Sequence, residues 1–423
     1  MIDVRVVAGL IALVLVGGVA AFFYYALTDV NFYSKAIKVP IVANFISSSV
    51  NASQVKYMNT QVLDEKSVIF DPNNLWGVNN DSKDMYRIPA GVISSTGRIF
   101  AVADYRIFGT GDHSNIDRCI AYSDDNGKTW KGHKIVLARE TGSGRVTDGS
   151  ITLAKLPNGK ERIICMSSYY QFSDSWFNVR EIGHNKSCFL MSYSDDDGKT
   201  WSMTKQLLTA SEKASLGIST SVVCPGNGIQ LKNGHIVISI HAITNLLHVR
   251  QRLFISKDYG KSWNVSNPAP AGDECQIVQS EEDGSIISIC RPFRNSPATR
   301  HIYRTTDEGM TWEEYYNHET FEASICQGSF LKVRHRGIYY YCYSSPVGGS
   351  RNNRQLRVTK DFKTWKQLHT ITNERCSGYS QLVYKEHLTK PVFGVIVEDY
   401  IADRSCILYQ NLTPLLDKLP TLF

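Results

Sequence analysis

An eight-residue motif that recurs along the chain constrains the fold more than any other feature of the sequence. Ser123–Trp130 reads SDDNGKTW and Ser194–Trp201 reads SDDDGKTW. Two further copies follow at Ser256–Trp263 and Thr305–Trp312, and a shortened copy without the glycine follows at Thr359–Trp365. Each copy comes after a run of β-branched and aromatic residues that ends at turn residues, which is the pattern of a β-hairpin.

The residue types of the motif predict a structural role in the turn. An Asp side chain can accept hydrogen bonds from the backbone N–H groups of a turn, and a Gly readily adopts the positive φ that many turns require. The Trp that ends the motif begins the returning strand and can cover the turn with a large apolar face. We therefore expect the Asp residues of the motif to stabilise turns, and we assign none of them to catalysis.

The spacing of the motif predicts a β-propeller. The tryptophans of successive copies stand roughly 50 to 70 residues apart, and repeats of about 50 residues made of short strands are typical of propeller blades. Strand-like runs continue from Ser67 to Gln410, which is enough chain for about six blades. We therefore expect an all-β, six-bladed β-propeller of four-stranded antiparallel blades over residues 66–423. Within it, Lys66–Asp71 should pair with the last blade near Cys406–Leu412.

The N-terminal part of the sequence differs from the repeats. Val6–Leu27 contains no charged residue and is long enough to span a bilayer as a helix. Its length and its bulky end favour an uncleaved anchor over a cleaved signal peptide, and Arg5 favours an outward-facing C-terminal part. We therefore expect residues 1–27 to form a signal anchor with a transmembrane helix, and residues 28–65 to form a stalk. The protein would be a single-pass membrane protein with its main domain at the cell surface or in a lumen, or secreted if the segment is cleaved.

Composition is consistent with an exported domain and disfavours two other classes of protein. The sequence has five N-x-S/T sites, at Asn51, Asn80, Asn185, Asn264 and Asn411. Its ten cysteines include no C-x-x-C pair, so we expect no zinc site, and their pairing stays open. The net charge of +6 is small for 423 residues and no basic run is present, so nucleic acid is not an expected partner.

Several charged or polar residues at the ends of strand-like runs are not explained by the repeats. They are Arg87 in YRIP, Arg106 and Asp112 in ADYRIFGTGD, Asp148 in GRVTDGS, Glu274 in DECQIV, Arg291 in ISICRPF, Arg351 and Arg354 in GGSRNNRQL, and Tyr379 in CSGYSQL. Any one of them alone is more simply interpreted as a surface ion pair or a hydrogen-bonded strand end. Because they lie in separate repeats, our hypothesis is that they converge at the axis of the propeller.

This combination of motifs resembles the sialidase, or neuraminidase, family of exo-glycosidases. The resemblance covers roughly Ser67–Gln410, and YRIP ahead of the repeats is its most specific signal, because other propellers also carry such repeats. It implies an exo-α-sialidase that hydrolyses terminal sialic acids with retention of configuration and needs no metal or organic cofactor. The implied partners are sialylated glycoproteins, glycolipids or oligosaccharides, with membrane attachment through the N-terminal helix.

The resemblance also implies a role for each residue. Tyr379 would be the nucleophile, Glu274 its base, and Asp112 the acid/base. Arg87, Arg291 and Arg351 would bind the carboxylate of the sialic acid, Arg106 and Asp148 would line the pocket near its 4-position and N-acetyl group, and Trp176 would cover the pocket. Arg354 stays an alternative to Arg351, because the repeat that follows both is the shortened one.

The chemistry of sialic acid explains these residue types. Its carboxylate lies on the anomeric carbon, where an arginine can form two parallel hydrogen bonds with it and where a carboxylate nucleophile would be repelled. A tyrosine stays neutral until a base takes its proton, which suits Tyr379 with Glu274. Tyrosine-dependent sialidases are a recognised exception to the use of two carboxylates in glycoside hydrolysis.

Three other functions are compatible with parts of the sequence. A trans-sialidase would pass the sugar to another glycan, but Pro346–Arg351 lacks the aromatic side chain expected to stack an acceptor sugar, so hydrolysis is favoured. A non-catalytic sialoglycan-binding propeller would be expected to have lost Tyr379, Glu274 or Asp112, and all three are present. A sorting-receptor propeller would share only the repeats.

Overall fold

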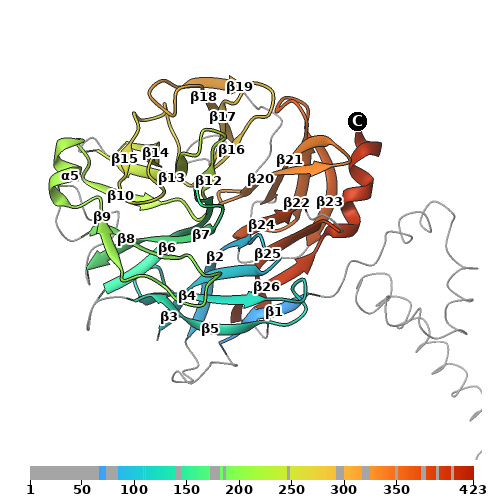
Figure 1. Cartoon of the computed structure of the whole chain (residues 1–423), viewed down its shortest axis with the longest axis horizontal. Coiled ribbons are helices and arrows are strands. Elements are labelled where there is room, and N and C mark those ends of the chain that lie inside the picture. Colours follow the sequence, from blue (N-terminus) through green and yellow to red (C-terminus); the bar gives the residue numbers. More distant parts are fainter. Residues whose placement is uncertain are drawn as a thin grey trace, which may run out of the picture. The chain divides into compact units, whose positions relative to one another are not determined.

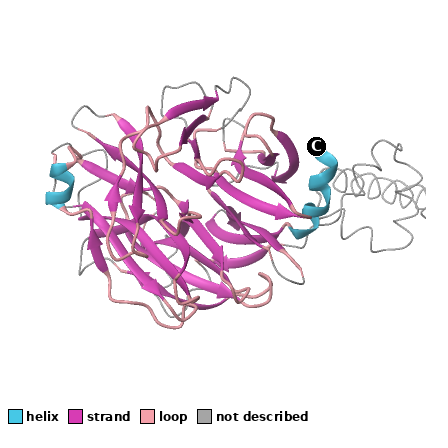
Figure 2. Cartoon of the chain, turned by 45° about the horizontal axis from the view of Figure 1, so that its top comes forward, coloured by secondary structure: helices cyan, strands magenta, loops and turns pink. Residues whose placement is uncertain are grey.

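The described part of the chain is almost entirely β-structure. The computed structural model describes residues 66–72, 84–107, 109, 111–138, 144–171, 182–183, 187–244, 248–291, 300–316, 324–347, 351–372, 378–386, 390–401 and 404–423. All of them lie in the unit Asp64–Phe423. Strands dominate the described residues (Figure 2), and the helices among them are the short α5 (Ala210–Ser215) and the C-terminal 3-10 helix η1 (Thr413–Leu422). The prediction of an all-β fold is confirmed.

The strands form five hydrogen-bonded sheets (Figure 1). The first contains β2 (Met85–Ile93), β3 (Ile99–Ile107), β4 (Asn115–Ser123), β5 (Lys131–Leu137), β6 (Gly144–Lys155), β7 (Glu161–Gln171), β8 (Ser187–Ser194), β9 (Lys205–Leu207) and β11 (Gly226–Asn227). The second contains β10 (Thr220–Val223), β12 (Ile229–Gln230), β13 (Ile236–Ile243), β14 (Val249–Ser256) and β15 (Asn264–Val265).

The other three sheets have four strands each. The third contains β16 (Cys275–Gln279), β17 (Ile286–Cys290), β18 (His301–Thr305) and β19 (Glu313–Tyr316). The fourth contains β20 (Ser329–His335), β21 (Ile338–Pro346), β22 (Arg354–Thr359) and β23 (Lys366–Thr372). The fifth contains β24 (Ser380–Lys385), β25 (Val392–Ile401), β26 (Arg404–Asn411) and β1 (Ser67–Phe70).

The prediction of six separate four-stranded blades is wrong. β4 and β6 pair in parallel, with Ile116 opposite Arg145, and this contact joins the eight strands from β2 to β9, together with β11, into one nine-stranded sheet. The other four sheets, of four or five strands each, are arranged like the blades of a propeller. The spacing of the repeats could not predict the pairing of β4 with β6, because it indicates how many hairpins the chain forms and not which neighbouring hairpins are hydrogen-bonded to each other.

The prediction of an N-terminal transmembrane helix, and with it of a single-pass membrane protein, finds no support and is withdrawn. Among the residues that the structure describes, no helix is long and apolar enough to cross a bilayer. The segment Val6–Leu27, on which the prediction was based, lies outside the described residues. An apolar run of that length shows only that enough chain is present for a span, and does not show that a spanning helix forms.

The two ends of the described unit meet in the fifth sheet. β1 pairs antiparallel with β26, with Ser67 opposite Tyr409. Figure 1 shows the blue β1 beside the red β26. This confirms the predicted pairing of Lys66–Asp71 with the C-terminal strand. Because β1 covers β26, the backbone groups at that edge are paired within the sheet.

The repeated turns are built as the motif predicts. In the first copy, the carboxylate of Asp125 accepts hydrogen bonds from the Thr129 N–H at 2.9 Å and from the Ser123 hydroxyl at 2.7 Å. Gly127 has a φ of 83°, which glycine adopts at little cost. Partial burial acts to raise the pKa of Asp125, but these hydrogen bonds outweigh it and lower the pKa to about 2. Equivalent bonds are accepted by Asp196, Asp258 and Asp307.

The shortened copy forms the same kind of turn with one residue fewer. Asp361 accepts hydrogen bonds from the N–H groups of Lys363 and Thr364 at 2.9 and 2.7 Å. The residue after the Asp, Phe362, has a φ of 60°, as the residues at this position have in the other copies. The missing glycine therefore shortens the turn without removing its central hydrogen bonds.

The packing of the sheets brings certain strand ends together. β16 packs beside β20, β20 beside β24, and β24 beside β2. Apolar side chains fill the space between neighbouring sheets, and the Trp of the third repeat, Trp263, stacks on Phe254 at 4.9 Å between ring centroids. Because β2, β16, β20 and β24 pack side by side and β17 pairs with β16, residues at the ends of these strands can contact one another.

Candidate active site

Three of the predicted residues contact one another directly. Tyr379 immediately precedes β24, Glu274 precedes β16, and Arg291 follows β17. The Tyr379 hydroxyl donates a hydrogen bond to Glu274 Oε1. Nη1 of Arg291 donates to Glu274 Oε2 at 2.7 Å and to the Tyr379 hydroxyl at 3.0 Å. The strand ends from two sheets thus place a phenol, a carboxylate and a guanidinium in one hydrogen-bonded group.

Burial keeps the Tyr379 phenol protonated. Desolvation, and after it the negative charge of Glu274, raise the pKa of Tyr379 well above its ordinary value, against the opposing effect of Arg291. The side chains of both Tyr379 and Glu274 are buried. The phenol is therefore neutral around neutral pH, and its hydrogen bond points at the one group that can take its proton.

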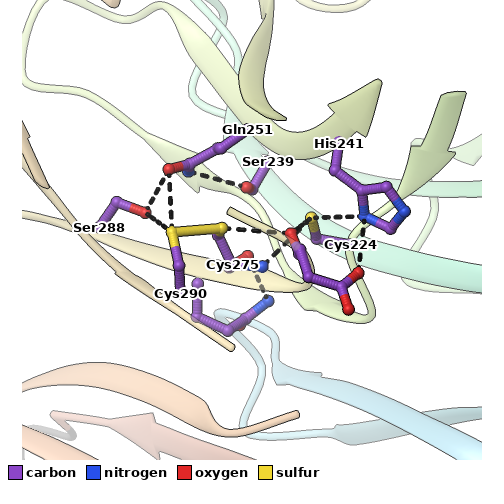
Figure 3. The surroundings of a disulfide bond; sticks show 9 residues. Cys224, Ser239, His241, Gln251, Cys275, Ser288 and Cys290 are labelled. Carbon is purple, nitrogen blue, oxygen red and sulfur yellow. Dashed lines mark hydrogen bonds and ion pairs between the residues drawn. A yellow bond between two sulfur atoms is a disulfide. The ribbon is translucent and has the colours of Figure 1, made fainter. Parts of the chain in front are cut away.

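The β16–β17 hairpin holds Glu274 and Arg291 side by side. The Arg291 N–H donates to the carbonyl oxygen of Glu274 at 3.0 Å. The next residues inward, Cys275 and Cys290, lie opposite each other in the antiparallel register and form a disulfide (Figure 3). The sequence left the pairing open, and the register of this hairpin decides it.

Arg87 lies on β2, where a bulge changes the direction of the strand. The register of β2 against β3 shifts between Arg87 and Ala90, and Ile88 has a φ of 57°, which is unfavourable for a β-branched residue. Buried partners hold this conformation, since Nη1 of Arg118 donates to the Ile88 carbonyl at 2.8 Å. The guanidinium carbon of Arg87 lies 5.3 Å from the centroid of the Tyr379 ring.

Glu398, which the sequence analysis missed, connects Arg87 to the backbone of Tyr379. It lies on β25, its side chain is fully buried, and its carboxylate is 3.2 Å from Nε of Arg87. It also accepts hydrogen bonds from the N–H groups of Ile88 at 2.7 Å and Tyr379 at 3.1 Å. Burial acts to raise its pKa, but Arg87 and these bonds hold the pKa of Glu398 below its ordinary value. An acidic residue directly after the apolar run FGVIV was the available sequence signal.

Arg351 and Arg354, the two candidates for the third arginine, occupy different places. The guanidinium carbon of Arg351 lies 5.8 Å from the centroid of the Tyr379 ring, and Nη2 donates to the Ile325 carbonyl at 3.4 Å. Arg354 is fully buried, and its Nη2 donates to the carbonyl oxygen of Tyr379 at 3.2 Å. Arg351 therefore lies at the ring of Tyr379, whereas Arg354 contacts its backbone.

Asp112 lies at the exposed edge of the group. Its side chain is 78% exposed, and Oδ1 is 2.8 Å from Nη2 of the buried Arg106 and 3.8 Å from Nη1 of Arg87. Desolvation acts to raise the pKa of Asp112, but the two neighbouring guanidinium groups together outweigh it. The charges of Arg106 and Arg87 hold the pKa of Asp112 below its ordinary value.

Asp148 lies near the same charges in a strained backbone conformation. It has a φ of 48°, and its N–H is 3.4 Å from Oδ2 of Asp104. Burial, followed by the negative charges of Asp104, Glu274 and Asp112, raises the pKa of Asp148 well above its ordinary value. Asp104 itself forms a fully buried ion pair with Arg118, which the sequence analysis did not single out. Trp176, the residue predicted to cover the pocket, lies outside the described residues.

Comparison with known proteins identifies the family. The chain matches the family model of the BNR repeat-like domain over residues 97–390. It is 29% identical to a sialidase of Paraclostridium sordellii, in an alignment that covers 82% of this chain and 87% of the relative. The chain belongs to the sialidase family. Within the described ranges, no group of three His, Cys, Asp or Glu side chains is arranged to hold a metal ion.

Two solved sialidases have a similar fold. The Hadza microbial sialidase Hz136 aligns with a TM-score of 0.68 at 24% identity, over 77% of this chain and 65% of that one. A Trypanosoma rangeli sialidase, solved with 2,3-difluorosialic acid as a covalent intermediate, aligns with a TM-score of 0.69 at 21% identity, over 85% of this chain and 59% of that one. This sialidase-family chain therefore spans about three fifths of the length of the two solved chains.

Proposed function

We propose that this protein is an exo-α-sialidase that hydrolyses terminal sialic acids from glycoproteins, glycolipids or oligosaccharides. The observation that carries the proposal is the hydrogen-bonded group of Tyr379, Glu274 and Arg291, in which a buried phenol faces a carboxylate base. Membership of the sialidase family supports the same reaction class.

Arg87, Arg291 and Arg351 are proposed to bind the sialic acid carboxylate. Their guanidinium groups approach Tyr379 from its ring and its hydroxyl, so an anion bound by all three would place the anomeric carbon near the phenol oxygen. Planar guanidinium groups form paired hydrogen bonds with a carboxylate, which gives direction as well as charge. Arg354 is excluded from this role in the proposal, because it is buried behind the Tyr379 backbone.

In the first step, the phenol oxygen of Tyr379 attacks the anomeric carbon while Glu274 accepts the phenol proton. The bond from the anomeric carbon to the leaving glycan breaks, and Asp112 protonates the departing oxygen. In the second step, Asp112 takes a proton from a water molecule that attacks the same carbon and releases Tyr379, which recovers its proton from Glu274. Two displacements at one carbon give net retention.

Asp112 must gain a proton before it can act as an acid. Its pKa is held low by Arg106 and Arg87 in the free protein. A bound sialic acid carboxylate would neutralise part of the Arg87 charge, and the bound glycan would exclude water, and both effects raise the pKa of a nearby carboxyl. Arg106 and Asp148 are proposed to line the pocket near the 4-position and the N-acetyl group, where a neutral Asp148 can donate a hydrogen bond.

The test uses the purified full-length chain with a fluorogenic aryl sialoside and with sialyllactose. We expect release of free sialic acid, and an unchanged yield of it when lactose is added as an acceptor. A new sialylated product in the presence of lactose would instead indicate transfer. Binding of sialosides without any release would indicate a non-catalytic lectin.

The nucleophile is tested by labelling with a 3-fluorosialosyl fluoride. Mass spectrometry of peptides should find the adduct on Tyr379, and Tyr379→Phe should abolish labelling and lower kcat by orders of magnitude. Tyr384→Phe is a matched control, because this tyrosine lies on β24, the strand that Tyr379 precedes, and donates its hydroxyl hydrogen bond to the Arg334 carbonyl instead. An adduct on Glu274 or Asp112 in the native protein would overturn the assignment.

The acid/base is tested by the choice of leaving group. Asp112→Asn should slow hydrolysis of sialyllactose much more than hydrolysis of the aryl sialoside, because an aryl leaving group needs little protonation. Equal losses on both substrates would contradict the role. In the native protein kcat/KM should rise as the pH is lowered from about 8 to about 5, because the free carboxyl has a low pKa and its protonated fraction grows.

A further inference from the structure

Asp273 stands next to the proposed base in the sequence but has no part in the reaction described above. Its carboxylate is 11% exposed and lies between partners from two different sheets. Oδ2 is 3.7 Å from Nε of Arg291, which follows β17 in the third sheet. Oδ1 is 3.7 Å from Nδ1 of His241, on β13 in the second sheet. Two adjacent acids thus contact the same arginine.

The backbone around Asp273 is held independently of its carboxylate. The Cys275 N–H donates to the sulfur of Cys224 at 3.3 Å, and that thiol donates to the carbonyl oxygen of Asp273 at 3.6 Å. Figure 3 shows Cys224 beside the ring of His241, with Sγ and Nδ1 3.9 Å apart. The position of the Asp273 carboxylate is therefore defined by contacts on both its backbone and its side chain.

The contacts of Arg291 use two edges of its guanidinium. Nη1 binds Glu274 and Tyr379, and Nε faces Asp273. A planar group held at two edges cannot rotate freely. When Glu274 takes the phenol proton it loses its negative charge, and its contact with Arg291 weakens. Asp273 keeps its negative charge at the other edge both before and after this transfer, so it holds Arg291 in both states.

We propose that Asp273 is a positioning residue for Arg291 and that His241 holds Asp273 in place. This inference rests on the proposed sialidase function. Asp273 contacts the substrate only through Arg291, so its removal weakens the binding of the substrate carboxylate in the ground state and in the transition state alike. A loss of such uniform binding raises KM and leaves kcat nearly unchanged.

His241 supports the charge of Asp273. Burial raises the pKa of the Asp273 carboxyl above its ordinary value, against the opposing effects of a protonated His241 and of Arg291. Burial lowers the pKa of His241, which favours its neutral form, so around neutral pH an uncharged ring faces the Asp273 carboxylate with Nδ1 3.7 Å from Oδ1. An uncharged amide donor at the position of Nδ1 should therefore replace it.

The experiment compares steady-state constants for the fluorogenic sialoside in the full-length chain. Asp273→Asn keeps the size of the side chain and removes its charge, and we expect KM to rise about tenfold with kcat changed less than about threefold. His241→Phe should also raise KM. His241→Asn can place an amide near the position of Nδ1, so its KM should stay close to that of the native protein. Asp283→Asn is the matched control, because it breaks an ion pair with Arg304 in the same sheet, away from Tyr379.

The outcomes separate this inference from the proposed function. An unchanged KM in Asp273→Asn, or a fall in kcat and melting temperature at unchanged KM, would overturn the positioning role while leaving the sialidase proposal intact. Binding of 2-deoxy-2,3-didehydro-N-acetylneuraminic acid is measured in parallel, and Asp273→Asn should weaken it by the same factor as KM. If the native protein neither hydrolyses the sialoside nor binds this probe, the proposed function fails and the inference fails with it.

Discussion

Replacing Asp125 by alanine should lower the free energy of unfolding by about 1–2 kcal/mol and leave catalysis unchanged. The carboxylate accepts hydrogen bonds from the Thr129 N–H at 2.9 Å, from the Ser123 hydroxyl at 2.7 Å and from the Thr129 hydroxyl. A hydrogen bond in a protein contributes about 0.5–1.5 kcal/mol net, and these three lie in a turn that is partly open to solvent, so values near the lower limit apply.

The pKa of Asp125 gives an upper limit by a separate route. A folded-state pKa of about 2, against 3.8 for the free group, corresponds to at most about 2.4 kcal/mol. Solvent screening of this partly exposed carboxylate reduces the figure to about 1–2 kcal/mol. Because the folded-state pKa is the lower one, the stabilisation is complete above about pH 4 and is lost as the pH falls toward about 2.

The assay is thermal and urea unfolding of native and variant proteins, followed by kcat/KM per folded molecule. For a unit of this size, 1–2 kcal/mol lowers the melting temperature by about 1–3 °C. Asp125→Asn keeps a hydrogen-bond acceptor but no charge, so its melting temperature should lie between those of the native protein and of Asp125→Ala. Lys128→Ala is the control, because this side chain is exposed in the same turn.

Two results would refute the reasoning. One is a large fall in kcat for Asp125→Ala without a change in melting temperature, which would indicate that the repeat takes part in catalysis. The other is a destabilisation that persists undiminished at about pH 2, where the Asp125 carboxylate of the native protein is about half protonated and most of its stabilising effect is lost.

Further variants test the arginines and the disulfide. Arg291→Lys should lower kcat/KM by about 10- to 150-fold, because a point charge replaces the guanidinium and one charged hydrogen bond of about 1.5–3 kcal/mol is lost. A native substrate affinity in this variant would contradict the proposed carboxylate-binding site. Arg351→Ala should raise KM with little change in melting temperature, whereas Arg354→Ala should mainly lower the melting temperature, and the reverse pattern would exchange their roles. Replacing Cys275 and Cys290 together by alanine should lower the free energy of unfolding by about 3 kcal/mol, because the disulfide closes a loop with a sequence separation of 15. An unchanged urea unfolding midpoint would contradict this stabilising role of the disulfide.

The repeated turns could be predicted from the sequence because all of their contacts are local. Asp125 and Thr129 are four residues apart, so the residue types within one motif are enough to form the turn. The all-β class follows from the same motif. The pairing of Lys66–Asp71 with the strand near Cys406–Leu412 was predicted from two strand-like ends, and only the structure gives its register, with Ser67 opposite Tyr409. The joining of β4 to β6 could not be predicted, because it depends on how two hairpins lie against each other and not on the sequence of either.

The candidate site divides in the same way. Short motifs pointed to Arg87, Glu274, Arg291 and Tyr379 individually, but the hydrogen bond from Tyr379 to Glu274 joins residues 105 positions apart and exists only through the packing of β16, β20 and β24. Glu398 was missed for a related reason, because it directly follows the apolar run FGVIV and its partners lie outside its own strand.

The third arginine shows most clearly what only the tertiary structure decided. Arg351 and Arg354 are three residues apart in one motif, and the sequence offers the same guanidinium at both positions. Left-handed backbone at Arg351 and Asn353, with φ values of 56° and 52°, turns the chain between them before β22 begins. One side chain therefore lies at the ring of Tyr379 and the other is buried behind its backbone, because a change of backbone direction over two residues separates groups that composition and spacing cannot distinguish.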